Sequence, residues 1–261
     1  TKERSWAYFQ TRQNPDAERD TRGLDLVVRP IDKKDHYIKR CIGLPGDSLQ
    51  IIDRQVYING KPGENPEFMQ YLYFVQSTTT PINLKKLDEW GISVNHGPAN
   101  GAFFMDAKQL AKVQSMGTDI VVTKYQAQDP NVFPHDKVHT PNWTFDNYGP
   151  IWIPKKDVTI ELTDANISFY SRIISVYEGN KFEIRNNEFY INEQKTNQYK
   201  FKQNYYWAMG DNRHNSEDSR AWGYVPEDHV VGKPFIIWFS LKNGTLRDGI
   251  QWKRVFSSPN K

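Results

Sequence analysis

Hydrophobic and polar positions alternate in short β-like runs near both ends of the chain, and the middle is more mixed. Residues 23–28 (GLDLVV) and 37–42 (YIKRCI) are rich in β-branched and aromatic side chains and predict strands. The GLPGD sequence that follows predicts a tight turn, because proline presets the first turn position and glycine accepts a positive φ. Residues 48–61 (SLQIIDRQVYINGK) then predict a hairpin that turns at Asp53 and Arg54.

The middle of the chain, residues 62–178, is rich in Pro, Asn, Thr and Gln. Helices are predicted near residues 83–90 and 106–114, and a third over residues 164–175 with Asp164 as its N-cap. Residues 121–154 contain five prolines and predict loops with short strands.

Strand-rich sequence resumes at Asn180 and continues to the C-terminus, with strands predicted over 205–209 and 230–239. Residues 180–193 resemble residues 47–60, because both contain an Ile at the fifth position and a Tyr-Ile-Asn triplet. An internal repeat and two unrelated hairpins of similar pattern both explain this likeness. The simplest organisation is a β domain built from both ends of the chain around an inserted middle segment.

Composition narrows the function classes. The net charge is only +3, with 34 basic against 31 acidic residues, which argues against nucleic acid as the main partner. A single cysteine, Cys41, excludes an intramolecular disulfide. The longest wholly apolar run is residues 235–239, far short of the roughly 20 residues that span a bilayer. The polar start without methionine suggests a soluble piece cut from a longer protein.

Lys39 stands in the middle of an otherwise apolar and aromatic strand pattern. In a strand, Tyr37, Lys39 and Cys41 share one face, so the amine would lie between a ring and a small thiol. Such desolvation disfavours the ammonium form and lowers the pKa of a lysine from its ordinary value near 10.4. Taken alone, Lys39 is better explained as a surface lysine whose amine reaches water, as in most strands that contain a lysine.

The second dense polar segment is GDNRHNSEDSRAWGYVP, residues 210–226. Predicted core strands bracket it, and it contains too few apolar residues for an ordinary helix. A polar loop held between core strands needs its charges paired. We therefore expect an ion-paired loop at this position.

Together, YIKRCIGLPGD and GDNRHNSEDSRAWGYVP resemble two signature boxes of bacterial type I signal peptidases, membrane-bound serine proteases of peptidase family S26 that use a Ser–Lys dyad. The resemblance implies a mainly β fold: a signal-peptidase and LexA-like antiparallel β catalytic domain with an inserted α+β second domain. The catalytic domain would comprise residues 1–61 and 199–261, and the variable second domain residues 62–198.

The resemblance also implies residue roles. Lys39 matches the general base, and Ser216 matches the serine that orients the lysine amine. Asp218 and Arg220 match a pair that braces the same loop, and Asp211 is expected to pair with Arg40. His214 replaces the aspartate that is commonest in the family, a change we expect to be tolerated. The full set of expected structural supports is Arg40, Asp211, Arg213, Asp218, Arg220, Gly43, Pro45, Gly46 and Gly210.

The family nucleophile belongs to a Ser-Met-x-Pro-Thr type motif, which this sequence does not contain. Ser5 is the only serine before Lys39, and its surroundings do not match. We therefore expect the chain as given to lack the nucleophile, half of the oxyanion hole and the transmembrane anchor, and to be inactive alone.

The resemblance further implies partners and location. Signal peptides of exported preproteins would bind as an added strand near Tyr37 and Cys41, with small residues at the first and third positions before the cut. Trp238 and Trp252 are candidates for contact with the bilayer surface, and residues 235–240 also fit a core strand. The translocation machinery is a further candidate partner, and the expected location is the extracytoplasmic, periplasmic face of the bacterial inner membrane.

No cofactor or metal is expected. The HDKVH sequence has two histidines, His135 and His139, at a spacing that suits metal on a helix. It lies between Pro134 and Pro141, so a helix is not expected there.

Two other functions stay open at this point. One is a non-catalytic relative that keeps the lysine boxes and binds extended peptides. The other is a different Ser–Lys protease, such as a self-cleaving repressor, which the length of the second box disfavours. A Ser-Met-x-Pro-Thr motif after a hydrophobic helix in the full-length protein would favour the peptidase over the peptide binder.

Overall fold

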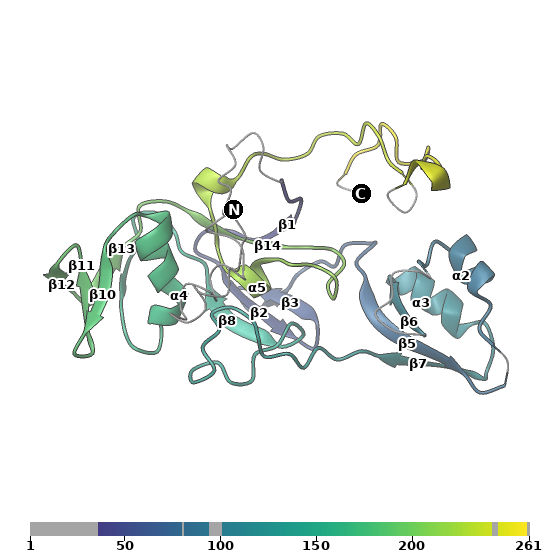
Figure 1. Ribbon diagram of the computed structural model, residues 1–261, viewed down its shortest axis with the longest axis horizontal. Helices are drawn as coiled ribbons and strands as arrows, with labels where there is room; N and C mark the ends of the chain where they lie inside the picture. Colours follow the sequence, from purple (N-terminus) through teal and green to yellow (C-terminus); the bar gives the residue numbers. More distant parts are fainter. Residues whose placement is uncertain (1–35, 80, 94–100, 242–244, 260–261) are drawn as a thin grey trace, which may run out of the picture.

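The structure is a computed structural model that describes residues 36–79, 81–93, 101–241 and 245–259. It is elongated, and short antiparallel strands dominate it (Figure 1), which confirms the expected mainly β class. The strand predicted over residues 23–28 lies outside the described residues.

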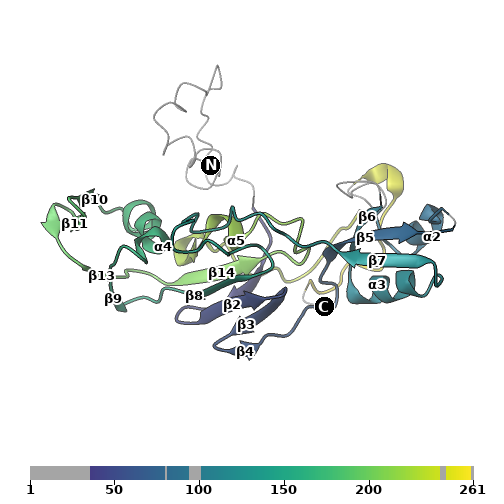
Figure 2. The ribbon, with the colours of Figure 1, turned by 90° about the horizontal axis from the view of Figure 1, so that it is seen from below.

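Two antiparallel sheets form the centre of the molecule (Figure 2). Their side chains share one buried core that includes Leu49, Tyr148 and Trp207. One sheet has the strand order β4-β3-β2-β8, with β2 (Ser48–Ile52), β3 (Gln55–Ile58), β4 (Lys61–Pro62) and β8 (Tyr148–Trp152). The other has the order β1-β14-β15, with β1 (Arg40–Gly43), β14 (Tyr205–Met209) and β15 (Val225–Pro226).

The turn and hairpin near the N-terminal end form as predicted. Gly46 has a φ of 96° in the turn after β1, and its amide donates to the Ile153 carbonyl at 2.8 Å. β2 and β3 pair antiparallel across Asp53 and Arg54, which both adopt positive φ. Local turn chemistry therefore sets the register of this hairpin.

A separate module occupies one end of the molecule, where β5 (Tyr71–Ser77) lies between β6 (Ala102–Met105) and β7 (Ile120–Lys124). Both predicted helices are present in it. α2 (Leu84–Glu89) is capped by Asn83, and α3 (Ala107–Gln114) begins with a capping box made by Asp106 and Gln109. The module has a hydrophobic cluster of its own, which contains Tyr71, Tyr73, Val75, Leu87, Ile92, Phe103, Met105 and Val113.

The opposite end carries the third predicted helix and the sequence echo. The helix is α4 (Ile167–Arg172), which continues as a π-helical turn, Ile173–Tyr177, and Asn166 rather than Asp164 precedes it. β10 (Phe182–Arg185) and β11 (Glu188–Ile191) form a hairpin whose turn residues have positive φ, like those of the β2–β3 hairpin. The short strands nearby are β9 (Thr159–Glu161), β12 (Gln194–Lys195) and β13 (Gln198–Lys200).

The middle segment does not fold as one unit separate from the ends. β8 lies inside the expected insert of 62–198, but it pairs with β2. Ile151, Tyr170 and Ile173 likewise contribute to the main core. Among the described residues, the buried members of the separate cluster lie between Tyr71 and Val113, and partly buried side chains from Met69 to Val122 pack against them.

The strand predicted over residues 230–239 is not present. In its place, isolated bridges join Ile237 to Ser257 and Leu241 to Ile250. Phe235 is 90% exposed and Trp238 75% exposed, so this segment is not a core strand. The apolar pattern of residues 235–240 fits both a buried strand and an exposed segment, so the sequence alone does not distinguish them.

Candidate active site

Lys39 and the second signature box meet where β1 and β14 pair. Arg40 lies opposite Met209 in this antiparallel pair, so Lys39, just before β1, lies beside Gly210, just after β14. Lys39 Nζ donates a hydrogen bond to Ser216 Oγ at 2.7 Å. The strand pairing thus brings together two side chains separated by most of the chain.

The backbone at Gly210 has to pass very close to this pair. A Cβ atom placed there would lie 2.2 Å from Ser216 Oγ and 3.5 Å from Lys39 Nζ. A side chain at position 210 would therefore push Ser216 away from the amine. Gly43, at the end of β1, is also tightly packed, since a Cβ there would meet Ile153 at 2.2 Å. Pro45 lies in the turn between β1 and β2.

Arg40 and Asp211 join the two boxes through a bidentate ion pair. Arg40 Nε lies 2.9 Å from Asp211 Oδ1, and Nη2 lies 2.8 Å from Oδ2. Both side chains are about one-third exposed, so solvent weakens the attraction. The fork geometry still fixes the direction of the loop as it leaves β14.

Asp218 and Arg220 form a second bidentate pair, and this pair is fully buried. The two hydrogen bonds are 2.9 Å and 2.7 Å long. Asp218 Oδ2 also accepts from the Gly210 amide at 3.0 Å, and Arg220 Nη2 donates to the Arg213 carbonyl at 2.7 Å. Burial favours the neutral acid, yet the charge and hydrogen bonds of Arg220 hold the pKa of Asp218 below its ordinary value. The pair therefore bonds the residues that follow Ser216 to Gly210 and Arg213, which precede it.

Arg213 is also buried, and its backbone rather than its side chain makes the identified hydrogen bonds. Its amide donates to the Gln70 carbonyl at 2.8 Å, and its carbonyl accepts from Arg220. Within the described part of the chain, its Nε and Nη1 have no hydrogen-bond partner. Burial lowers the pKa of this guanidinium from its ordinary value.

His214 has buried partners that the sequence did not indicate. Its Nε2 lies 2.7 Å from Asp146 Oδ1, and both side chains are almost fully buried. Asp146 in turn lies 3.5 Å from Arg54 Nε. Asp146 comes from a loop in the proline-rich middle segment, 68 positions from His214, and no local motif marks it as a partner.

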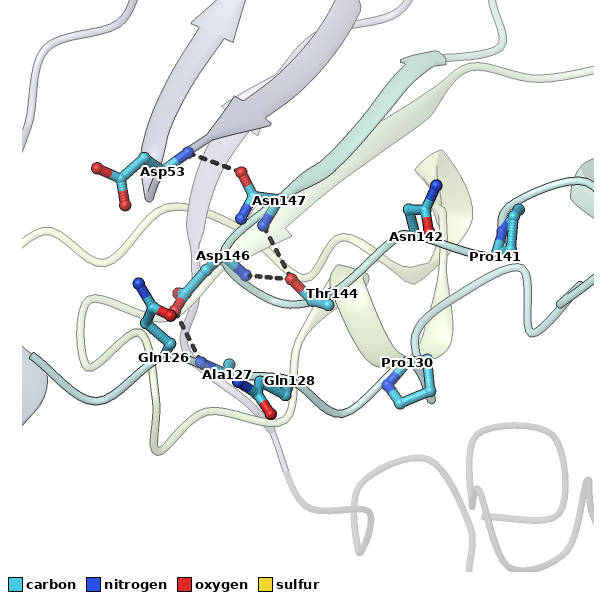
Figure 3. Close-up of a pocket in the computed structure, with 10 residues that line it drawn as sticks. All are labelled: Asp53, Gln126, Ala127, Gln128, Pro130, Pro141, Asn142, Thr144, Asp146 and Asn147. Carbon is cyan, nitrogen blue, oxygen red and sulfur yellow. Dashed lines mark hydrogen bonds between the residues drawn. The ribbon is translucent and has the colours of Figure 1, made fainter.

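Asp146 also borders a polar cleft (Figure 3). Its backbone amide donates to Thr144 Oγ1, and its Oδ2 accepts from the Ala127 amide at 2.9 Å. The remaining lining side chains are mostly carboxamides and prolines from the same loops. The lining comprises Asp53, Gln126, Ala127, Gln128, Pro130, Pro141, Asn142, Thr144, Asp146 and Asn147.

The surroundings of Lys39 differ from the prediction that Tyr37 and Cys41 would lie beside its amine and exclude water from it. β1 begins at Arg40, so Tyr37 is not in the strand; Tyr37 is 72% exposed and Cys41 is also exposed. Lys39 itself is half-buried. Among the described residues β1 pairs with β14 alone, which leaves its other edge without a strand.

The C-terminal candidates for membrane contact are both exposed. Trp238 and Trp252 are 75% and 73% exposed, and Phe256 beyond them is 75% exposed. The described residues include no helix with the length and hydrophobicity of a membrane span.

The two histidines of HDKVH point to different partners. His135 Nε2 lies 2.9 Å from the Ala221 carbonyl, whereas His139 Nδ1 lies 2.7 Å from Asp136 Oδ2. In the described part of the chain, no three His, Cys, Asp or Glu side chains are grouped as metal ligands.

Comparisons with known proteins agree on one family. A family model described as "Signal peptidase, peptidase S26" matches residues 7–106 and 151–239. Signal peptidase I of Buchnera aphidicola subsp. Baizongia pistaciae is 25% identical over 239 residues, 88% of this chain and 60% of that protein. Signal peptidase I of Helicobacter pylori strain J99 is 25% identical over 258 residues, 93% of this chain and 67% of that protein.

One of the matches has a higher identity over a short segment. Signal peptidase I of Aquifex aeolicus is 55% identical over 42 residues, 16% of each chain. The chain spans less than two thirds of the length of the Buchnera protein.

Proposed function

The chain belongs to the signal peptidase family, peptidase S26, and from this premise we propose that it is a membrane-anchored serine endopeptidase that removes signal peptides from exported preproteins. The observation that carries the proposal is the 2.7 Å hydrogen bond between Lys39 Nζ and Ser216 Oγ. An ordinary surface lysine needs no such partner. Here two ion pairs and a closely packed glycine fix the loop that supplies the hydroxyl.

We assign Lys39 the role of general base and Ser216 the role of orienting its amine. A serine hydroxyl attacks the carbonyl carbon of the scissile bond, Lys39 takes its proton, and the leaving amine receives a proton in turn. Lys39 then activates a water molecule that hydrolyses the acyl-enzyme. The 261-residue sequence contains no Ser-Met-x-Pro-Thr motif, and in this proposal the nucleophile is the serine of that motif in the full-length protein.

The substrate segment would bind in extended form along the outer edge of β1. This edge has no neighbouring strand among the described residues, and its amides and carbonyls can hydrogen-bond to an added strand. A bound strand would also cover half-buried Lys39 and exclude water from the amine.

The exposed aromatic side chains of the C-terminal segment support contact with a bilayer surface. Trp238 and Trp252 expose large rings, and tryptophan is favoured at the interface between lipid and water. We propose that this segment rests on the extracytoplasmic face of the bacterial inner membrane. Contact with the translocation machinery stays a prediction.

The test is cleavage of a preprotein by the full-length protein. The wild type should release the mature chain, and Lys39→Ala should lower kcat by about 10²–10⁴-fold, the usual contribution of a general base. Lys61→Ala removes an exposed lysine from β4 and should leave the rate unchanged. Full activity of Lys39→Ala would overturn the assignment.

The alternative function is binding of extended peptides without cleavage. The open edge of β1 supports it equally. Stable binding of a signal peptide by the full-length protein without hydrolysis, and without an acyl-enzyme detectable by mass spectrometry, would favour this alternative.

A further inference from the structure

His214 occupies a buried position between two parts of the molecule. Its ring makes edge-to-face contacts with the rings of Tyr71 and Tyr125, at centroid distances of 5.2 Å and 5.3 Å. Tyr71 begins β5 and Tyr125 directly follows β7. His214 belongs to the loop of residues 211–216, and its imidazole thus packs against the module that contains β5, β6 and β7.

The hydrogen bonds of the ring define its tautomer. The Leu72 amide donates to His214 Nδ1 at 3.1 Å, so Nδ1 is an acceptor and carries no proton. Nε2 therefore carries the proton and donates it to Asp146 Oδ1 at 2.7 Å. A neutral imidazole satisfies both partners, one on each side of the loop.

The same loop runs beside the start of β5. The Gln70 amide donates to the Asp211 carbonyl at 2.9 Å, and the Arg213 amide donates to the Gln70 carbonyl at 2.8 Å. A parallel bridge pairs Gln70 with Asn212. These bonds, together with that of Leu72 to His214, attach the loop backbone to the module.

The other side of the ring rests on a buried charge cluster. Asp146 is held by the Ala127 amide and by Arg54, whose Nη2 donates to the Tyr125 carbonyl. Although burial raises the pKa of Asp146, its hydrogen bonds with His214 and Ala127 bring that pKa below the ordinary value. The carboxylate is therefore a fixed acceptor for Nε2.

We infer that His214 is a positioning residue, which locks the loop of residues 211–216 between Leu72 and Asp146 and thereby holds Ser216 at Lys39. This inference rests on the proposed function. Ser216 lies two residues beyond His214, so rotation of the loop would displace its hydroxyl. A misplacement of about 1 Å in a site of this kind costs roughly 10²-fold in rate.

Two conservative variants separate the two contacts. His214→Asn keeps an acceptor near the Nδ1 position for Leu72, and His214→Gln keeps a donor near the Nε2 position for Asp146. His214→Ala loses both. The matched control is His139→Gln, which changes another histidine that contacts an aspartate, Asp136, outside the site.

The experiment measures kcat, KM and melting temperature for preprotein cleavage by the full-length protein. We expect His214→Ala to lower kcat by about 10–100-fold with KM little changed, and each conservative variant to restore part of the loss. His139→Gln should match the wild type. If His214→Ala does not fold, the Asn and Gln variants supply the same comparison.

The outcomes distinguish the two proposals. If the wild type cleaves and the folded His214 variants keep the wild-type kcat, the positioning role is wrong. The same conclusion follows if the melting temperature falls but kcat per folded molecule does not. If the wild type itself does not cleave, the proposed function fails first.

Discussion

Ser216 Oγ accepts a hydrogen bond from Lys39 Nζ at 2.7 Å, across the junction of β1 and β14. A lysine amine rotates freely on a flexible stem, so a single fixed hydroxyl restricts where its lone pair can point. The hydroxyl is itself fixed by a loop with one ion pair that is about one-third exposed and one that is buried. The position and orientation of the Lys39 amine therefore depend on the conformation of the loop that contains Ser216.

Replacing Ser216 with alanine should weaken catalysis without preventing folding. We expect kcat for preprotein cleavage to fall by about 10–100-fold with KM little changed, because the amine loses its orientation and not the substrate contacts. Ser115→Ala, which removes an exposed hydroxyl at the end of α3, is the control. An unchanged kcat in Ser216→Ala would contradict the orienting role.

Breaking the buried pair of Asp218 and Arg220 should destabilise the fold. Asp218→Asn leaves the buried guanidinium without its counter-charge, a change that typically costs about 3–5 kcal/mol in the free energy of unfolding. Urea unfolding of the 261-residue protein measures this loss. Glu67→Gln, which breaks an exposed pair with Lys108, should leave the urea midpoint unchanged. Equal midpoints for the two variants would refute the bracing role.

His135 should make stability depend on pH. Burial lowers its pKa to about 4, despite the hydrogen bond to the Ala221 carbonyl, from an ordinary value of 6.5. The unfolded chain then binds the proton more readily, so stability is complete above pH 6.5 and is lost as the pH falls toward 4. Allowing for partial exposure, the loss should be about 1–2 kcal/mol.

The measurement for this prediction is the urea midpoint between pH 7 and pH 4. His135→Gln should be less stable than the wild type at pH 7 and should lose less stability on acidification. His139→Gln serves as the comparison variant. A parallel decline in the wild type and His135→Gln would show that other groups cause the pH dependence.

The exposed tryptophans should contribute to binding of lipid vesicles. Replacing Trp238 and Trp252 together with serine should weaken partitioning to anionic vesicles by about tenfold, which corresponds to roughly 1.4 kcal/mol. Val138→Ser, at a position that is 81% exposed, controls for general loss of apolar surface. Sedimentation with vesicles measures the partitioning, and equal binding by all three proteins would exclude these rings as contacts.

Local signals in the sequence predicted local structure well. The turn at Gly46, the β2–β3 hairpin and the helices capped by Asn83 and Asp106 all form where their residues indicated. Each of these features is determined by side chains within a few positions of one another, so spacing alone contains the information.

Contacts between segments that are distant in the sequence could not be predicted from local patterns. The pairing of β8 with β2 and the contact of Asp146 with His214 join distant segments, and neither is marked by a local motif. The C-terminal aromatic run has a pattern that fits both a buried strand and an exposed segment, and its exposure decides between them. The juxtaposition of Lys39 and Ser216 was expected because both lie in boxes that resemble those of a known family.

The pairing of β1 with β14 has a consequence for how the protein folds. This pairing places Cys41 opposite Ala208, and a contact so distant in sequence forms only when the long intervening chain closes, at an entropic cost that local contacts do not have. The amine and its hydroxyl partner would thus meet late, once most of the polypeptide is ordered. A nascent or partly folded molecule would therefore carry both groups without yet joining them in one site.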